Sequence, residues 1–393
     1  MKTPAASMER PELLSAAQVR AFRLSRHHLV DRAPRMSLIP AVSDVCGIQA
    51  QVSSAANLSA RARVEQLSPQ DVGRSLWSER SLVRTWCLRS TVHLVSSNDL
   101  PMLAAALSVR AQRGRERWAA ARRLTSGELA AVVRDAVEAL DDAPATYAEL
   151  RNRIVVALPR RAARTCDQTA IAQLVQIACV EGMLVSGPTA GPRTTFVRSE
   201  RWCPGSKRMS VREAQDALLR RYLHSYAPAT LHDFASWSGL AVGDAQPVWD
   251  RLVQAGEMVD VTVNGNSARL IRGDLSAIRA MSLTKRHVRL LPAFDIYLLA
   301  HRDKSLLVSS VNYGRIYRKA ARVSPVLLVD GCAAGIWSCT TRGSKLRLRV
   351  EPLGKVPKAV RAGIDREAAD ISRFLGVRVE LEFGRIASPS FVT

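Results

Sequence analysis

Two glutamines separated by one alanine, Gln49 and Gln51, have the types and the spacing that could do chemistry. In an extended stretch both amides would face one pocket, whereas in a helix they would diverge by roughly 200°. An amide combines an acceptor with a donor, so it can hold a water or a sugar oxygen, but it cannot act as a strong base. The pair therefore suits a reaction that depends on positioning. Glutamines that bind backbone at a helix end would have the same spacing.

The charge of the chain indicates a polyanionic partner. Its 393 residues carry a net charge of +22, and the pI is about 10.7. Such an excess attracts nucleic acid. There are only eight lysines against 49 arginines, and the guanidinium fork binds phosphate through two parallel hydrogen bonds. A GC-rich genome would explain the preference for arginine, but not the excess of positive charge.

Cysteine usage and the lack of targeting segments indicate the compartment. The seven cysteines form no CxxC pair, and no histidine cluster has zinc spacing. We therefore expect reduced thiols, no metal and no cofactor. Residues 1–11 lack the apolar core of a secretion signal, and no apolar run reaches the roughly 18 residues that span a membrane. We predict a cytoplasmic, nucleoid-associated protein without a membrane partner.

The elements that must position the glutamines follow an order that occurs three times: helices, then two short strands. This is the order of a winged helix. Capping signals at Ser15, Ser68, Thr146, Ser210 and Thr230 open several of the helices. The predicted helices are 14–29, 40–48, 53–64, 69–78, a long one from 99 to about 123, 125–140, one from 146, 168–181, 210–224, one from 230, and 241–255. The predicted strands are 82–87 and 91–95, then 183–186 and 194–198 around a wing at 187–193, then 258–263 and 267–271.

The last third of the chain has a different pattern, rich in strands. We predict strands over 288–291, 305–308, 326–329, 333–339, 346–350 and 377–383, with a helix over 356–375. The predicted fold is therefore α+β, with three tandem winged-helix motifs and a C-terminal β-rich domain. The predicted domain limits are 13–123, 124–205, 206–280 and 281–393.

Several motifs, in order, resemble a known family, the AlkZ-like winged-helix DNA glycosylases. The resemblance covers roughly residues 13–383, and Ala50 and Ser90 depart from the family pattern, which has a bulkier apolar residue and a glycine there. The matching stretches are Gln49-Ala50-Gln51, Trp86-Cys87-Leu88-Arg89-Ser90-Thr91-Val92-His93-Leu94-Val95, Leu291-Pro292-Ala293-Phe294-Asp295, His301-Arg302-Asp303-Lys304-Ser305, Val329-Asp330-Gly331 and Gly335-Ile336-Trp337.

The resemblance implies a fold that encloses a DNA channel and an enzyme that hydrolyses the N-glycosidic bond of N7- or N3-alkylated purines. Some members unhook bulky or crosslinked adducts made by antibiotics of the same organism, so self-resistance and repair are both implied roles. The catalytic role is carried over only to Gln49 and Gln51. An N7-alkylated guanine is already cationic and leaves without a general acid. Neutral amides can then place a water and steady the sugar cation.

The candidate DNA contacts are basic or aromatic side chains near these motifs: Arg89, His93, Arg110, Arg113 and Arg302. His93 would contact a phosphate or the lesion, or else be a buried strand histidine. The arginines would clamp the DNA backbone, or else form surface salt bridges. Asp295 and Asp303 could be read as metal ligands, but structural capping suits their spacing better.

Other functions predict different behaviour. A winged-helix transcriptional regulator would dimerise and read a palindrome, whereas three dissimilar units in one chain favour a monomer on duplex DNA. A nuclease would need a divalent metal. A lyase would need a lysine, and none lies between Lys2 and Lys207. We therefore predict a monofunctional glycosylase.

Overall fold

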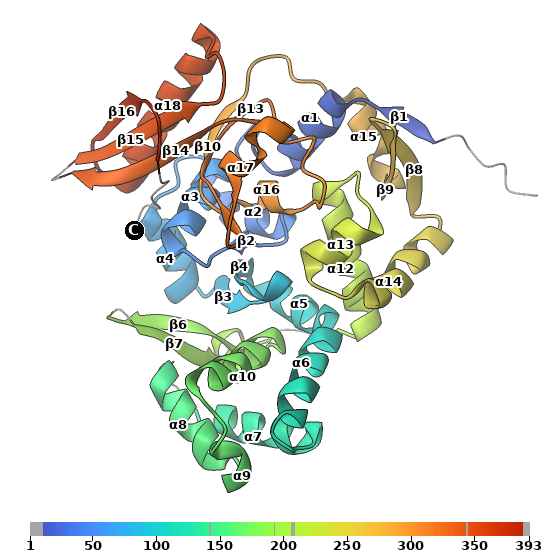
Figure 1. The fold of residues 1–393 in the computed structure, drawn as a ribbon, viewed down its shortest axis with the longest axis vertical. Coiled ribbons are helices and arrows are strands. Elements are labelled where there is room, and N and C mark those ends of the chain that lie inside the picture. Colours follow the sequence, from blue (N-terminus) through green and yellow to red (C-terminus); the bar gives the residue numbers. More distant parts are fainter. Residues whose placement is uncertain (1–10, 141–142, 192, 206–208, 343–344, 388–393) are drawn as a thin grey trace, which may run out of the picture.

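A computed structural model describes residues 11–387 except 141–142, 192, 206–208 and 343–344 (Figure 1). The predicted lack of a secretion signal concerns the N-terminal segment, which lies almost wholly outside the described residues, as does Pro192 of the predicted second wing. The observed class is α+β, as predicted, with a β-rich C-terminal part. No helix in the described ranges is long and apolar enough to cross a membrane.

The first unit combines four helices with a three-stranded sheet. Ser15 and Ser68 cap the starts of α1 and α4, as predicted, and the structure shows that each forms a capping box. Its elements are α1 (Ala16–Arg26), α2 (Leu38–Asp44), β2 (Ile48–Gln49), α3 (Ser53–Arg63), α4 (Pro69–Trp77), β3 (Leu82–Trp86) and β4 (Val92–Ser96). The sheet order is β2-β4-β3, with both pairings antiparallel, and Gln49 lies opposite His93.

The second unit forms the lower lobe in Figure 1. Its sheet has the order β5-β7-β6, and β6 continues through most of the predicted wing. Its elements, with the two helices that lead into it, are α5 (Leu100–Ala106), α6 (Ser108–Ala120), α7 (Ser126–Glu138), β5 (Ala145–Thr146), α8 (Tyr147–Ala157), α9 (Arg160–Ala163), α10 (Gln168–Val180), β6 (Leu184–Ala190), β7 (Arg193–Arg198) and α11 (Ser199–Trp202).

The third unit repeats the pattern, and the Asn264-Gly265 hairpin forms as predicted. Its sheet gains a strand from the N-terminus, because β1 (Glu12–Leu14) pairs in parallel with β8. Its own elements are α12 (Val211–Tyr226), α13 (Leu231–Ser238), α14 (Val242–Gln254), β8 (Met258–Val263), β9 (Asn266–Ile271) and α15 (Leu275–Ala280). The first and third units are thus joined by the start of the chain. The winged-helix assignment of each unit and the domain limits stay predictions.

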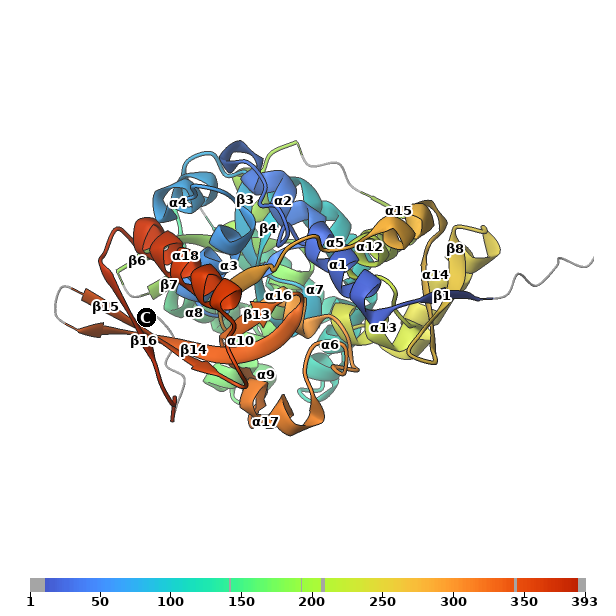
Figure 2. The same ribbon diagram turned by 90° about the horizontal axis from the view of Figure 1, so that it is seen from above.

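The C-terminal part is a five-stranded sheet covered by one long helix, α18 (Lys358–Leu375). The sheet order is β10-β13-β14-β15-β16, and Asp330-Gly331 makes the predicted hairpin turn with positive φ at both residues. The other elements are β10 (Val288–Leu291), α16 (Ile296–Leu299), α17 (Tyr313–Ile316), β11 (Tyr317–Arg318), β12 (Arg322–Val323), β13 (Val326–Val329), β14 (Cys332–Arg342), β15 (Lys345–Pro352) and β16 (Val379–Phe383). Figures 1 and 2 place this sheet and the third unit on opposite sides of the first unit.

Two predicted elements are wrong. The long helix from Asp99 is broken at Leu107, whose ψ of 2° ends α5 before α6 begins. The predicted strand at 305–308 is a turn, because Asp303 accepts hydrogen bonds from Ser305 while the amides of Leu307 and Val308 bond to the carbonyl of Lys304. Leu307 and Val308 are buried in the core, which explains the strand-like pattern.

Candidate active site at the glutamine strand

The glutamine stretch is not helical: Ile48 and Gln49 form β2, and Gln51 lies two residues further on, before α3 begins at Ser53. Gln49 ends β2, and the amide of Ala50 donates to the carbonyl of Val92 on β4 at 2.7 Å. Gln49 is 9% exposed and Ala50 is buried, while Gln51 is exposed. The first glutamine is therefore fixed inside the structure, and the second lies at its surface.

Tight packing before β2 sets where the strand begins. Gly47 has a φ of +96°, and a Cβ there would lie 2.7 Å from Cγ1 of Val95 and 3.0 Å from the carbonyl oxygen of Leu94. Only glycine combines that backbone angle with such a close approach. The chain leaving α2 is thereby held directly against β4, one residue ahead of the strand that carries Gln49.

Arginines hold the stretch from both sides. Arg84 on β3 donates to the carbonyl of Ala50 through Nε and Nη2, at 3.4 and 3.3 Å. Arg89 donates through Nη2 to Oε1 of Gln49 at 3.2 Å and through Nη1 to the carbonyl of Trp237 at 3.0 Å. Burial lowers the pKa of both guanidiniums, and both remain charged. Neither has an ion pair with a carboxylate in the described part of the chain.

His93 completes the contacts around Gln49. It is fully buried, its Nδ1 lies 3.0 Å from the carbonyl of Thr91, and its Nε2 lies 3.4 Å from Nη2 of Arg89. Burial and the positive charge of Arg89 lower the pKa of His93 to about 3. The ring is therefore neutral, with Nδ1 as donor to Thr91 and Nε2 as acceptor toward Arg89.

The two glutamine side chains differ in how much hydrogen-bonding capacity they leave for a ligand. Arg89 occupies the oxygen of Gln49, and the amide of Val92 donates to the oxygen of Gln51 at 3.4 Å, a long and weak contact. The side-chain NH2 group of neither glutamine donates a hydrogen bond to a described residue. A carbonyl oxygen has two lone pairs, so the oxygen of Gln51 can still accept a hydrogen bond from a bound water.

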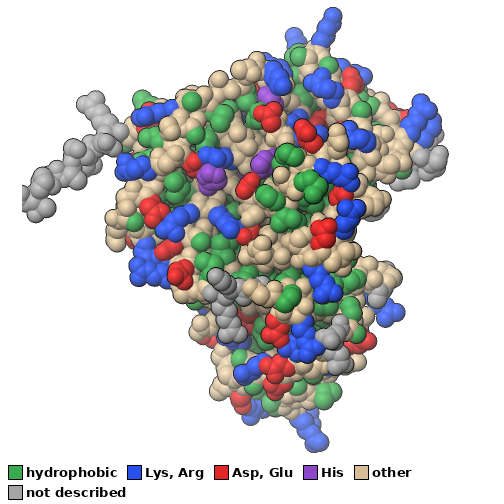
Figure 3. Space-filling model, turned by 180° about the vertical axis from the view of Figure 1, so that it is seen from behind, with side chains coloured by type: hydrophobic (Ala, Val, Ile, Leu, Met, Phe, Trp, Pro, Cys, Tyr) green, Lys and Arg blue, Asp and Glu red, His purple; other side chains and the backbone are tan. Residues whose placement is uncertain are grey.

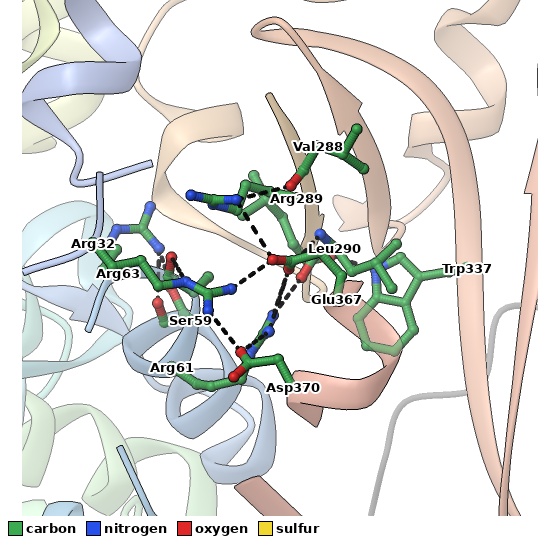
Figure 4. A network of polar contacts seen from close by, with 12 residues as sticks. Arg32, Ser59, Arg61, Arg63, Val288, Arg289, Leu290, Trp337, Glu367 and Asp370 are labelled. Atoms are coloured by element: carbon green, nitrogen blue, oxygen red, sulfur yellow. Dashed lines mark hydrogen bonds and ion pairs between the residues drawn. The ribbon is translucent and has the colours of Figure 1, made fainter. Parts of the chain in front are cut away.

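The helix that follows Gln51 is anchored in a buried ionic network (Figure 4). Arg61 on α3 pairs with Glu367 and Asp370 of α18 and donates to the carbonyl of Leu290 at 3.1 Å. Arg63 forms two 2.8 Å bonds to Asp295, which also accepts from Ser59. The C-terminal part thus fixes the helix that directly follows the glutamines.

The candidate DNA contacts fall in three places. Arg89 contacts Gln49, and His93 lies opposite Gln49 on β4 and contacts Arg89. Arg110 donates to the carbonyl of Cys87, at the start of the turn that leads to Arg89, at 3.2 Å. Arg113 forms an ion pair with Asp244, and Arg302 is exposed and lines a separate cavity of about 450 Å³. The sequence did not single out Arg84 or the carbonyl of Trp237. Their contacts join distant segments, and no local spacing marks them.

Asp295 and Asp303, the carboxylates that could be read as metal ligands, have structural partners. Asp295 pairs with Arg63 and caps α16 through the amide of Tyr297 at 3.0 Å, and Asp303 accepts from Ser305. Within the described ranges, no three His, Cys, Asp or Glu side chains gather as a metal site. These carboxylates therefore serve the fold.

A family model described as "DNA glycosylase AlkZ-like" matches residues 42–374. The chain belongs to the AlkZ-like DNA glycosylases. It is 27% identical over 371 residues to the interstrand DNA cross-link repair glycosylase of Streptomyces sahachiroi, covering 92% of this chain and 96% of that protein. It is also similar to the solved structure of DNA glycosylase AlkZ from the same organism. That likeness has a TM-score of 0.82 at 25% identity and covers 95% of this chain and all of the other. The resemblance inferred from the motifs is confirmed, and this AlkZ-like protein is an enzyme.

The family helps to interpret the two departures from its pattern. Ser90 has a φ of +58° and directly follows Arg89, whose φ is +52°. Glycine adopts this left-handed conformation at little cost, and serine adopts it at a cost. In this AlkZ-like chain the side-chain Nε2 of Gln176 donates to the carbonyl of Ser90 at 3.0 Å and helps to hold the turn. Ala50 is fully buried, so its small size affects packing beneath the strand.

Proposed function

We propose that this AlkZ-like glycosylase acts on duplex DNA as a monomer and hydrolyses the N-glycosidic bond of N7- or N3-alkylated purines. The name of the Streptomyces sahachiroi relative refers to interstrand crosslinks, so bulky and crosslinked adducts belong to the proposed range. The reaction is monofunctional and leaves an abasic site. No cofactor is required in this account.

The observation that carries the proposal is that the two glutamine side chains differ in burial and in how firmly their oxygens are hydrogen-bonded. Gln49 is buried and held by the Arg89 cation, whereas Gln51 is exposed and its oxygen is engaged only at 3.4 Å. Gln51 is therefore the amide that accepts a hydrogen bond from the nucleophilic water. Gln49 forms a fixed part of the site next to Gln51.

The reaction does not need a strong general base. The bond from C1′ to the alkylated purine breaks with its electron pair going to the base, which neutralises the cationic ring. A water oxygen then adds to C1′ of the oxocarbenium-like sugar, and its proton leaves to solvent. The negative end of an amide dipole both orients that water and favours the developing positive charge. An unmodified base lacks the positive charge that makes it leave, so the weak catalyst selects for the lesion.

The structure of Lys304 supports monofunctional chemistry. Its ammonium donates to the carbonyls of Leu298 and His301 and lies 5.2 Å from the centre of the Tyr317 ring. Burial is the largest influence on this lysine and lowers its pKa to about 8. A lowered pKa favours the nucleophilic free amine, but the carbonyls of Leu298 and His301 and the Tyr317 ring hold this amine within the fold, and these contacts disfavour a Schiff base.

A single-turnover assay on a duplex with one N7-methylguanine, in EDTA, tests the proposal. We expect free base and an alkali-labile site, with no strand break before alkali and no covalent complex after borohydride. Breaks without alkali, or a trapped complex, would overturn the monofunctional mechanism. A lack of excision on both this duplex and a crosslinked duplex, together with a sequence-specific footprint on undamaged DNA, would identify a DNA-binding regulator instead.

A further inference from the structure

A cavity of about 410 Å³ lies between α6 and α10, beside the turn that carries Arg89. We call it the α6–α10 cavity. Its cationic lining comes from Arg110, Arg117 and Arg122, and its apolar lining includes Ile177 and Val180. Figure 1 shows α6 and α10 side by side, and the indole of Trp118 on α6 donates to the carbonyl of Ala170 on α10 at 2.9 Å.

Ion pairing divides the arginines of α6 into two classes. Arg113 pairs with Asp244, and Arg115 pairs with Glu181. Arg110 and Arg117 have no ion pair with a described residue, and both line the α6–α10 cavity. The chain therefore neutralises those arginines of α6 that point away from the cavity and leaves the cavity charged.

The charge in the cavity has no internal compensation. Arg122 lies 4.1 Å from the centre of the Trp118 ring and donates to a backbone carbonyl, so it too lacks an acidic partner among the described side chains. Burial lowers the pKa of Arg110, and the positive charge of Arg117 lowers it as well. An anion in the cavity would relieve this repulsion.

Other arginines of the molecule lie beside acidic side chains. In Figure 3, which shows the molecule from behind the view of Figure 1, basic and acidic side chains are interspersed. Ion-paired arginines such as Arg220, which binds Glu257 at 2.6 and 2.8 Å, add little to an attraction for phosphate. The unpaired arginines of the α6–α10 cavity differ in that their charge is available to a ligand.

The cavity also connects directly to the glutamine site. Ser90 lines it, and Gln176 from its α10 wall donates to the Ser90 carbonyl. Arg110 from its α6 wall donates to the carbonyl of Cys87, at the start of the turn that leads to Arg89. A group bound in the cavity therefore rests against the same turn that holds Gln49.

We propose that the α6–α10 cavity binds a backbone phosphodiester of the DNA strand next to the lesion. The unpaired guanidiniums take the phosphate oxygens, and the apolar wall takes the adjoining deoxyribose. The position next to the lesion rests on the proposed function of Gln49 and Gln51. The phosphate site itself does not depend on it, because binding is measured without catalysis.

Arg117 is the side chain to change, since it is exposed and its loss breaks no ion pair. We expect Arg117→Gln to weaken binding of a duplex with a tetrahydrofuran abasic site by about tenfold. The salt dependence, as the slope of log affinity against log salt, should become less steep by about 0.9, the value for one lost phosphate contact. Arg117→Lys should recover most of the slope. Arg220→Gln, the matched control, should change neither quantity.

A set of duplexes with one neutral methylphosphonate at successive positions locates the contact. One position beside the abasic site should weaken binding by wild type and cause no further loss in Arg117→Gln. An unchanged affinity and slope for Arg117→Gln would overturn the proposal, as would equal losses for both proteins at every position. Failure of excision with this pattern intact would instead refute the glutamine mechanism alone.

Discussion

The guanidinium of Arg89 donates to Oε1 of Gln49 at 3.2 Å while its other amino group donates to the carbonyl of Trp237 on α13. One side chain thereby fixes the orientation of the buried amide and ties the glutamine strand to the third unit. Gly239 allows this approach, because a Cβ there would lie 3.0 Å from the backbone of Arg89.

This contact predicts that Arg89 acts on catalysis by positioning. Arg89→Met should lower the single-turnover excision rate by about 10- to 100-fold, because the Gln49 amide loses its fixed partner. Arg89→Lys should restore part of the rate. The exposed Arg74 on α4 provides the control, and Arg74→Met should excise at the wild-type rate. Equal losses of rate and of DNA affinity in Arg89→Met would show that Arg89 is only a phosphate contact.

Buried His93 predicts a dependence of stability on pH. Its pKa is about 3 in the folded protein against about 6.5 when unfolded, so between these values only the unfolded chain takes up the proton. The free energy of unfolding should therefore fall with decreasing pH from 6.5, by up to about 1.4 kcal/mol per pH unit for this group. Burial lowers the pKa of His27 and His301 too, which adds to the effect. Urea titrations between pH 4 and 8 give the free energy of unfolding at each pH. The slope of this free energy against pH should be shallower for His93→Gln than for wild type. An identical slope would show that His93 does not cause the pH dependence.

The left-handed turn at Ser90 predicts a stabilising substitution. Ser90→Gly removes the cost of a side chain at φ +58° and should raise the free energy of unfolding by about 0.5–1 kcal/mol. Ser108→Gly, at the start of a right-handed helix, should lower it by a similar amount. Thermal and urea unfolding measure both, and a destabilised Ser90→Gly would show that the serine side chain stabilises the turn.

The buried network predicts a large loss when one member is neutralised. Burial alone would raise the pKa of Glu367, but Arg61, Arg32 and Arg289 outweigh it and lower the pKa. The contribution of Glu367 is therefore present above about pH 4.5 and lost as the pH falls through its folded value. Glu367→Gln should cost about 3–5 kcal/mol of unfolding free energy at pH 7. The exposed pair of Lys345 with Glu380 is the comparison, and Glu380→Gln should cost less than about 1 kcal/mol.

The parts of the fold that local signals specify were predictable. The helix starts at Ser15, Ser68 and Thr230 and the turn at Asn264-Gly265 depend on neighbours within three residues, and each formed as expected. The extended form of the glutamine stretch was one of two alternatives. It depends on pairing with β4, more than 40 residues away, which no local pattern could decide.

The candidate site depended more on distant contacts. Arg61 and Glu367 are 306 residues apart, and their pairing follows from the fold alone. The sequence indicated Arg110 and Arg113 as DNA contacts without showing which arginines of α6 would be free of an ion pair. That distinction required Asp244 and Glu181, which come from other helices and neutralise two of them.

The most direct test of the account compares wild type with Gln51→Ala in single-turnover excision of N7-methylguanine, alongside the binding of both proteins to the uncleaved duplex. Gln70→Ala, an exposed glutamine on α4, is the matched control. We predict that Gln51→Ala loses excision by about 100-fold or more while it binds the duplex as wild type does, and that Gln70→Ala keeps full activity. Full excision by Gln51→Ala would contradict the central claim that this amide places the water.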